Sequence, residues 1–405
     1  MRGNKSDCLG DYLEVVVERI LPGGMGLAHA GERTVFVALS APGDHLRVKI
    51  ERVKGRIAFA SITEILGPSP DRVAPPCPYF GRCGGCDFQQ LNYEAQLAAK
   101  VEIIKDCLRR IGGLQDIPDI QITPAPQQWH YRSRAQWQYD SARKRLGYFE
   151  SGSRRVCDVT ECAVLAPQLQ YLLSMLRQRL ETDSLPRDTR DFRAVIGDKA
   201  VSLSPGISSS GVSDGNPHDV HRSIDRETYT LNAESFFQAN AELLPQLIEV
   251  ALRDAKGESA LELYCGVGLF TLPLARRFKH VIGVEGDAAA TELAGVNLAN
   301  AGLSNAMIAN EAVGNWLAWN EHNPNLAELD FLLLDPPRTG AESRVIAGIL
   351  QLHPNRICYV SCDPATLARD LKKLINAGYS LDSIVAFDMF PQTHHVETVV
   401  HLKKL

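Results

Sequence analysis

The residue best suited to chemistry is Cys362, in the stretch Arg356–Leu371, R-I-C-Y-V-S-C-D-P-A-T-L-A-R-D-L. The apolar run 357–360 predicts a buried parallel strand, and Asp363 followed by Pro364 predicts the start of a helix. Cys362 would then lie at the sheet edge where open α/β proteins bind ligands. A helix N-terminus stabilises a thiolate, which suits a nucleophile. The alternative is a buried, inert cysteine.

A carboxylate, Glu397, begins the last apolar run of the chain, in H-H-V-E-T-V-V. This run predicts a final strand. An ionisable side chain beside so apolar a segment is either paired or functional.

Three cysteines stand close together: Cys77, Cys83 and Cys86, in C-P-Y-F-G-R-C-G-G-C. The two glycines between them allow the backbone to fold tightly round an inorganic core. Three near thiols and one distant thiol suit an iron–sulfur cluster, and a zinc site with four cysteines is the alternative. The candidates for the fourth ligand are Cys107, Cys157 and Cys162.

A strand, a glycine-rich turn and a helix are predicted over residues 258–270, E-S-A-L-E-L-Y-C-G-V-G-L-F. Gly266 and Gly268 would let the backbone approach a cofactor closely. The next predicted strand ends in Glu285, which could bind ribose hydroxyls. A dinucleotide site would need a third glycine, so the turn favours S-adenosylmethionine over NAD.

These elements imply several domains in a chain of 405 residues, of which 45% are apolar and 22% charged. The net charge of −5 gives no overall signal for nucleic acid. Ten cysteines in a chain this long suggest metal ligands, catalysis or core positions rather than disulfides. No apolar run predicts a membrane span or a signal peptide, so we expect a cytoplasmic protein.

We predict three domains. Residues 1–67 read as short strands of a small OB-like β-barrel, and residues 68–230 as a central α+β domain that carries the cysteine cluster. Residues 231–405 alternate strands and helices and predict a C-terminal doubly wound, Rossmann-like α/β domain. The segment 93–123 could pack on this last domain. Residues 204–222 are polar and aperiodic, which predicts a loop.

Two basic stretches could contact nucleic acid. Arg47, Lys49 and Arg52 share one predicted strand of the barrel, and residues 129–155 interleave arginines with aromatic residues. That mixture suits phosphate contacts with base stacking, and it equally fits an antiparallel sheet with one polar face.

Together these motifs resemble the S-adenosylmethionine-dependent RNA 5-methyluridine methyltransferases, in the iron–sulfur branch that modifies 23S ribosomal RNA. The resemblance covers nearly the whole chain. It implies a [4Fe-4S] cluster with Cys162 as the fourth ligand beside Cys77, Cys83 and Cys86. It implies that the nucleophile is Cys362 and the base Glu397. The cofactor contacts it implies are Gln238, Tyr264, Glu285 and Asp335.

The implied reaction begins when the Cys362 thiolate attacks uracil C6, which makes C5 nucleophilic enough to take the methyl group. Glu397 then removes the C5 proton. The implied partner is RNA, with the target uridine unpaired or flipped, and we expect a monomer. The alternatives are the same reaction on transfer RNA and a non-catalytic RNA-binding iron–sulfur protein.

Overall fold

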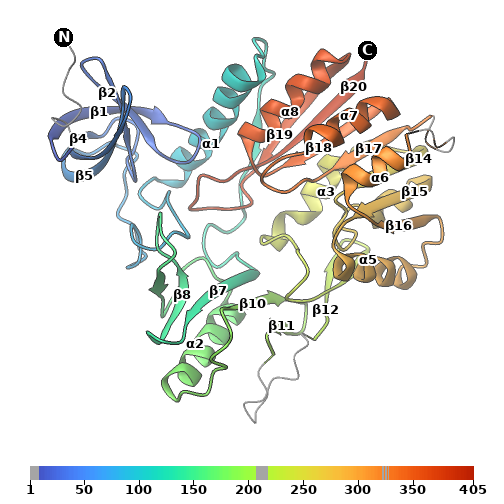
Figure 1. The fold of residues 1–405 in the computed structure, drawn as a ribbon, viewed down its shortest axis with the longest axis horizontal. Coiled ribbons are helices and arrows are strands. Elements are labelled where there is room, and N and C mark those ends of the chain that lie inside the picture. Colours follow the sequence, from blue (N-terminus) through green and yellow to red (C-terminus); the bar gives the residue numbers. More distant parts are fainter. Residues whose placement is uncertain (1–8, 207–217, 322, 324–325, 327) are drawn as a thin grey trace.

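The computed structural model describes residues 9–206, 218–321, 323, 326 and 328–405. Figure 1 shows a small barrel, a central sheet with a helix across it, and a larger sheet covered by helices on both faces. None of the described helices is both long and apolar enough to cross a membrane.

The N-terminal barrel is closed by five strands in the order β1-β2-β3-β5-β4. Its strands are β1 (Tyr12–Ile20), β2 (Gly26–Ala30), β3 (Arg33–Val37), β4 (His45–Lys54) and β5 (Ile57–Gly67). Along β4, buried Leu46, Val48 and Ile50 alternate with outward residues, as the pleat of a strand requires. Outward-facing Arg47 pairs with Glu14 and Glu64, so its charge is offset locally.

The central domain contains a five-stranded sheet in the order β11-β10-β7-β8-β9. Its elements are β7 (Arg134–Asp140), β8 (Arg145–Phe149), β9 (Val156–Asp158), α2 (Pro167–Glu181), β10 (Asp191–Ile196) and β11 (Val201–Ser204). Trp137 and Tyr131 are buried, whereas Gln136 is exposed. The sheet therefore has one polar face, which is the second of the two interpretations of residues 129–155, and neither of these two aromatic side chains is exposed for stacking on an RNA base.

The C-terminal domain is built on an eight-stranded sheet in the order β16-β15-β14-β17-β18-β20-β19-β6. The parallel strands are β14 (Gly257–Leu263), β15 (Phe278–Glu285), β16 (Ala306–Asn310), β17 (Phe331–Leu334) and β18 (Arg356–Ser361). Strand β20 (Glu397–Lys404) runs antiparallel between β18 and β19 (Tyr379–Phe387). The strand order reverses beside β14, which is where such sheets bind cofactors.

Helices cover both faces of this sheet, each face with its own apolar core. One face packs against α3 (Leu244–Leu252), α4 (Thr271–Ala275) and α5 (Ala288–Asn300). The other packs against α6 (Val313–Trp319), α7 (Ser343–Leu352), α8 (Pro364–Asn376) and α1 (Tyr93–Cys107). The predicted doubly wound α/β fold of the C-terminal domain and the small N-terminal barrel are both confirmed.

Two segments from before residue 231 lie against the C-terminal domain. Helix α1, with the π-helical turn Leu108–Gly112, packs on α8, and β6 (Gln121–Thr123) pairs with β19. The hairpin of β12 (Val220–Ile224) and β13 (Glu227–Leu231) is held to α5 by Asn297, which bonds Thr230. The predicted loop 204–222 is wrong at its ends, which belong to β11 and β12. Its middle, 207–217, lies outside the described residues.

Candidate active site

The predicted catalytic and cofactor residues lie along one edge of the large sheet. Tyr264, Glu285, Asp335 and Cys362 each end a parallel strand or follow it directly. Ser361 of β18 is opposite Thr398 of β20. Cys362 directly follows Ser361 and Glu397 directly precedes Thr398, so the two lie close together, and Glu397 acts electrostatically on Cys362. Residues that are far apart in the chain thus lie along the same edge of the sheet.

Cys362 stands at the N-terminus of α8, as predicted, and Asp363 caps that helix by accepting the Thr366 N–H at 2.8 Å. The thiol is nevertheless not poised as a thiolate. Burial raises the pKa of Cys362 to about 12, and Glu397 and Asp335 act in the same direction. The expectation of a thiolate stabilised by the helix was wrong for the free protein, because burial and two carboxyls outweigh the helix N-terminus.

Glu397 and Asp335 form a coupled acidic pair beside the thiol. Glu397 is 1% exposed, and its Oε1 has no hydrogen-bond partner among the described residues. Burial, and then the charge of Asp335, raise the pKa of Glu397 well above its usual value, while Arg338 opposes the shift. Burial raises the pKa of Asp335 to about 7, and a hydrogen bond from Gln238 counters part of this. Both shifts favour the protonated forms of the pair.

The glycine-rich turn between β14 and α4 adopts a left-handed backbone at three positions. Tyr264 has φ of 65°, Gly266 of 53° and Gly268 of 92°. The Glu285 carboxylate ties this turn to β15, because it accepts the N–H of Gly266 at 3.0 Å and that of Asp287 at 2.8 Å. Open space next to Gly266, where a Cβ would meet nothing within 4 Å, leaves room for a ligand over the turn.

Two further residues near this site, Glu262 and Arg338, were not predicted from the sequence. Glu262 lies in β14 with 1% exposure and accepts a hydrogen bond from the Thr271 hydroxyl. Burial raises the pKa of Glu262 to about 8. An acid inside the apolar run L-E-L was the available signal. Arg338, which directly follows Asp335-Pro-Pro, acts electrostatically on both Cys362 and Glu397.

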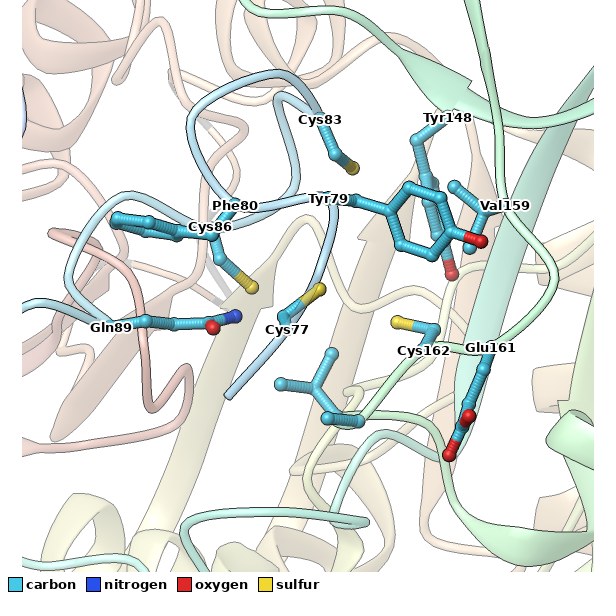
Figure 2. A pocket seen from close by; sticks show the side chains of 12 residues that line it. Cys77, Tyr79, Phe80, Cys83, Cys86, Gln89, Tyr148, Val159, Glu161 and Cys162 are labelled. Atoms are coloured by element: carbon cyan, nitrogen blue, oxygen red, sulfur yellow. The ribbon is translucent and has the colours of Figure 1, made fainter. Parts of the chain in front are cut away.

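The predicted metal ligands gather in a separate pocket of the central domain. Cys77, Cys83, Cys86 and Cys162 all line it, and in Figure 2 their sulfur atoms point into the same space. The other two candidates lie elsewhere: Cys107 is buried in the core under α8, and Cys157 accepts a hydrogen bond from Arg82 at 3.3 Å. Within the part of the chain described, no three His, Cys, Asp or Glu side chains converge closely enough to hold a single metal ion.

The chemistry of this pocket fits an anionic metal cluster. Burial raises the pKa of Cys83 to about 11 and of Cys86 to about 12, so these thiols are neutral without a metal. Without a shared ligand, nothing draws their sulfur atoms together. The Arg132 guanidinium lies near Cys86 and Cys162, and its Nε is buried without a partner among the described residues. Tyr148 Oη is likewise buried and unpartnered at the pocket wall. A cation and a free donor are what a cluster with four thiolates would require around it.

Comparison with known proteins places this geometry in context. The pattern of the tRNA (Uracil-5-)-methyltransferase family matches residues 221–405, and that of the TRAM domain matches residues 7–63. The structure is similar to that of Pyrococcus abyssi tRNA (uracil-54, C5)-methyltransferase in complex with S-adenosyl-L-homocysteine, with a TM-score of 0.71 and 26% identity. That alignment covers 96% of this chain and 100% of the other.

Sequence relatives extend along the whole chain. An RNA methyltransferase of Thermosynechococcus vestitus is 33% identical over 97% of this chain and 98% of its own. The 23S rRNA (uracil(1939)-C(5))-methyltransferase RlmD of Vibrio parahaemolyticus is 32% identical over 96% of this chain and 95% of its own. The RlmD of Alkalilimnicola ehrlichii is 33% identical over 95% of both. With such relatives over nearly its full length, the chain belongs to the RNA (uracil-5-)-methyltransferase family.

Proposed function

We propose that this protein transfers a methyl group from S-adenosylmethionine to C5 of a uridine in 23S ribosomal RNA. One observation carries the proposal: Cys362 lies beside Glu397, a buried carboxyl with an oxygen unpartnered among the described residues, at the sheet edge that also holds the glycine-rich turn. An amino-group methyltransferase would need no such cysteine. A protein that only binds RNA would need neither residue.

Cys362 is the proposed nucleophile. Attack of its Sγ on uracil C6 forms the S–C6 bond and moves the C5=C6 electron pair into an enolate, which makes C5 nucleophilic. S-adenosylmethionine supplies the electrophilic methyl group, on a sulfonium whose positive charge favours ionised carboxyls nearby. Once C5 has taken the methyl group, loss of the C5 proton re-forms the double bond and expels the Cys362 thiolate.

Glu397 is the proposed base. Two protons must leave, one from the thiol before attack and one from C5 afterwards, and two carboxyls stand beside Cys362. Asp335 already accepts a hydrogen bond from Gln238, whereas Glu397 Oε1 is free. A carboxylate with a raised pKa is also the stronger base. These differences favour Glu397 for the C5 proton.

The cofactor would bind over the glycine-rich turn. Glu285 ends β15, where a carboxylate can accept hydrogen bonds from ribose hydroxyls. Tyr264 opens the turn, Asp335 acts electrostatically on Cys362, and Gln238 donates a hydrogen bond to Asp335. Together these four residues would hold the methyl group between the turn and Cys362.

A [4Fe-4S] cluster would be held by Cys77, Cys83, Cys86 and Cys162. Methyl transfer moves no net electrons, so the cluster has no place in the reaction. It would fix the fold of residues 77–90, which surround the pocket. We propose that RNA binds to the barrel and to the exposed arginines of the central domain, such as Arg143 and Arg155.

Ribosomal RNA is favoured over transfer RNA by the two RlmD relatives, while the similar solved structure is that of a transfer RNA enzyme. The test is to incubate purified protein with methyl-labelled S-adenosylmethionine and either RNA, and to map 5-methyluridine by mass spectrometry. We expect label at one uridine of 23S ribosomal RNA. Label confined to transfer RNA would change the substrate, and 5-methyluridine in neither would refute the proposal.

A further inference from the structure

The segment 388–396, between β19 and β20, leads directly into Glu397, so its conformation decides where the proposed base lies. Gln392 in this segment has φ of 69°, a left-handed conformation that costs a side-chain-bearing residue free energy. Gln96 of α1 holds it there, because its amide accepts the Gln392 N–H at 2.9 Å and donates to Gln392 Oε1 at 3.0 Å. Lys100 pairs with buried Asp388 and donates to the Phe390 carbonyl at 3.1 Å.

The cysteine-bearing loop grips the same segment. The N–H groups of Asp87 and Phe88 both donate to the Gln392 carbonyl, at 3.1 and 3.0 Å. The Asp87 carboxylate accepts the His394 N–H at 2.8 Å with one oxygen and contacts His394 Nδ1 with the other. Because Asp87 directly follows Cys86, the loop that carries three of the four cysteines is fastened to the segment that carries the base.

The barrel reaches the same point. Gly24 lies in the turn between β1 and β2 with φ of 80°. A Cβ at Gly24 would be 3.0 Å from Asp87 Oδ2 and 3.2 Å from His394 Nδ1. A side chain at Gly24 would press on the Asp87 carboxylate and on His394, so three domains meet at one carboxylate.

From His394 the contact continues toward the site. Its ring lies against that of His395, with centroids 4.2 Å apart. His395 is close enough to Arg338 for that charge to act on it, and Arg338 acts in turn on Cys362 and Glu397. Asp87 thus lies at one end of a row of neighbouring side chains that leads to the groups around Cys362 and Glu397.

We propose that Asp87 is a positioning residue for the catalytic base: seated between Gly24 of the barrel and His394, it fixes the segment 388–396 and hence the place of Glu397. The proposal rests on the proposed function, since it assigns Asp87 a part in the step that Glu397 performs. Asp87 touches neither RNA nor cofactor in this role.

The test is Asp87→Ala, assayed with methyl-labelled S-adenosylmethionine and RNA. We expect kcat to fall by about 10- to 100-fold, the effect of misplacing a reacting group by about an ångström, with the KM for S-adenosylmethionine unchanged. Because adduct formation precedes proton removal, a methyl-labelled protein–RNA complex should accumulate on denaturing gels. Asp87→Asn keeps an acceptor for the His394 N–H and should restore most of the turnover.

Asp158→Ala is the matched control, because Asp158 also accepts one backbone N–H, from Leu146, and pairs with a cation, Arg177, but lies away from the segment 388–396. It should trap no complex. Iron content should be the same in both variants. Wild-type turnover in Asp87→Ala, or a loss that comes with loss of iron and without a trapped complex, would overturn the proposal.

A pair of glycine variants gives a second test should Asp87→Ala fail to fold. Gly24→Ala adds a methyl group against Asp87 and His394, whereas Gly23→Ala, at φ of 88°, adds one to open space. Both positions have a left-handed φ, of 80° at Gly24 and 88° at Gly23, so the added contact is the main difference, and only Gly24→Ala should trap the labelled complex. Equal behaviour of the two variants would refute the role of Asp87. An inactive wild-type protein would instead refute the proposed function.

Discussion

At the scale of single residues, Cys362 and Glu397 divide the reaction between an early and a late step, so their variants should fail differently. Cys362→Ala cannot form the bond to C6 and should yield neither product nor covalent complex. Glu397→Gln keeps the thiol but cannot remove the C5 proton, and should accumulate a protein–RNA complex that carries the transferred methyl group. A denaturing gel with methyl-labelled S-adenosylmethionine distinguishes them. Normal turnover in Glu397→Gln, or trapped RNA in Cys362→Ala, would reverse the assignment.

Glu285 should contribute to cofactor affinity and to nothing else in the reaction. Its carboxylate is already oriented by two backbone N–H groups, so little ordering remains to be done when a ribose binds. Glu285→Ala should weaken S-adenosylmethionine binding by about 1–3 kcal/mol, the cost of losing a charge-assisted hydrogen bond. Calorimetric titration measures this. Glu258→Ala, at the other end of β14, should leave the affinity unchanged.

At the scale of elements, strand β14 holds a buried acid that makes stability depend on pH. Burial raises the pKa of Glu262 from 4.5 to about 8. A raised pKa means that the protonated form stabilises the fold at low pH, and that this contribution is lost as pH rises through the window from about 4.5 to 8. The contribution of Glu262 to the free energy of unfolding of the C-terminal domain should fall by on the order of 5 kcal/mol across that window.

Glu262→Gln removes this ionisable group and should weaken the pH dependence of the free energy of unfolding. Melting temperatures at pH 5 and pH 8 measure it: the wild-type protein should lose more stability than Glu262→Gln between these two values. Glu258→Gln, on the same strand but exposed and paired with Lys279, should behave like the wild type. Equal pH dependence in Glu262→Gln and the wild type would show that Glu262 is ionised in the folded protein.

At the scale of the whole molecule, the iron–sulfur cluster remains a prediction with a direct test. Anaerobically purified protein should be brown, with about four irons per chain. Serine at Cys77, Cys83, Cys86 or Cys162 should abolish the colour. Cys107→Ser and Cys157→Ser should retain it, because those thiols do not line the pocket. Stoichiometric zinc without visible absorption would contradict the prediction.

The sequence alone was enough for the elements whose signals are local. An apolar run followed by a helix-capping residue or by glycines indicates a strand-to-helix turn. The position of Cys362 before α8 and the turn after β14 could therefore be predicted. Alternation of side chains likewise predicted the barrel strands. The family could also be predicted from the sequence, because several of its short motifs occur in order along the chain.

Only the tertiary structure decided what depends on distant neighbours. The pKa of Cys362 could not be predicted, because burial and two carboxyls from other strands set it. The basic and aromatic stretch 129–155 split into core and surface once the sheet was formed. The register of β18 against β20 brought Cys362 close to Glu397, and the contact of Gly24, Asp87 and His394 joined three domains. Local propensity acts over a few residues, whereas burial and charge are set by whatever the fold brings alongside.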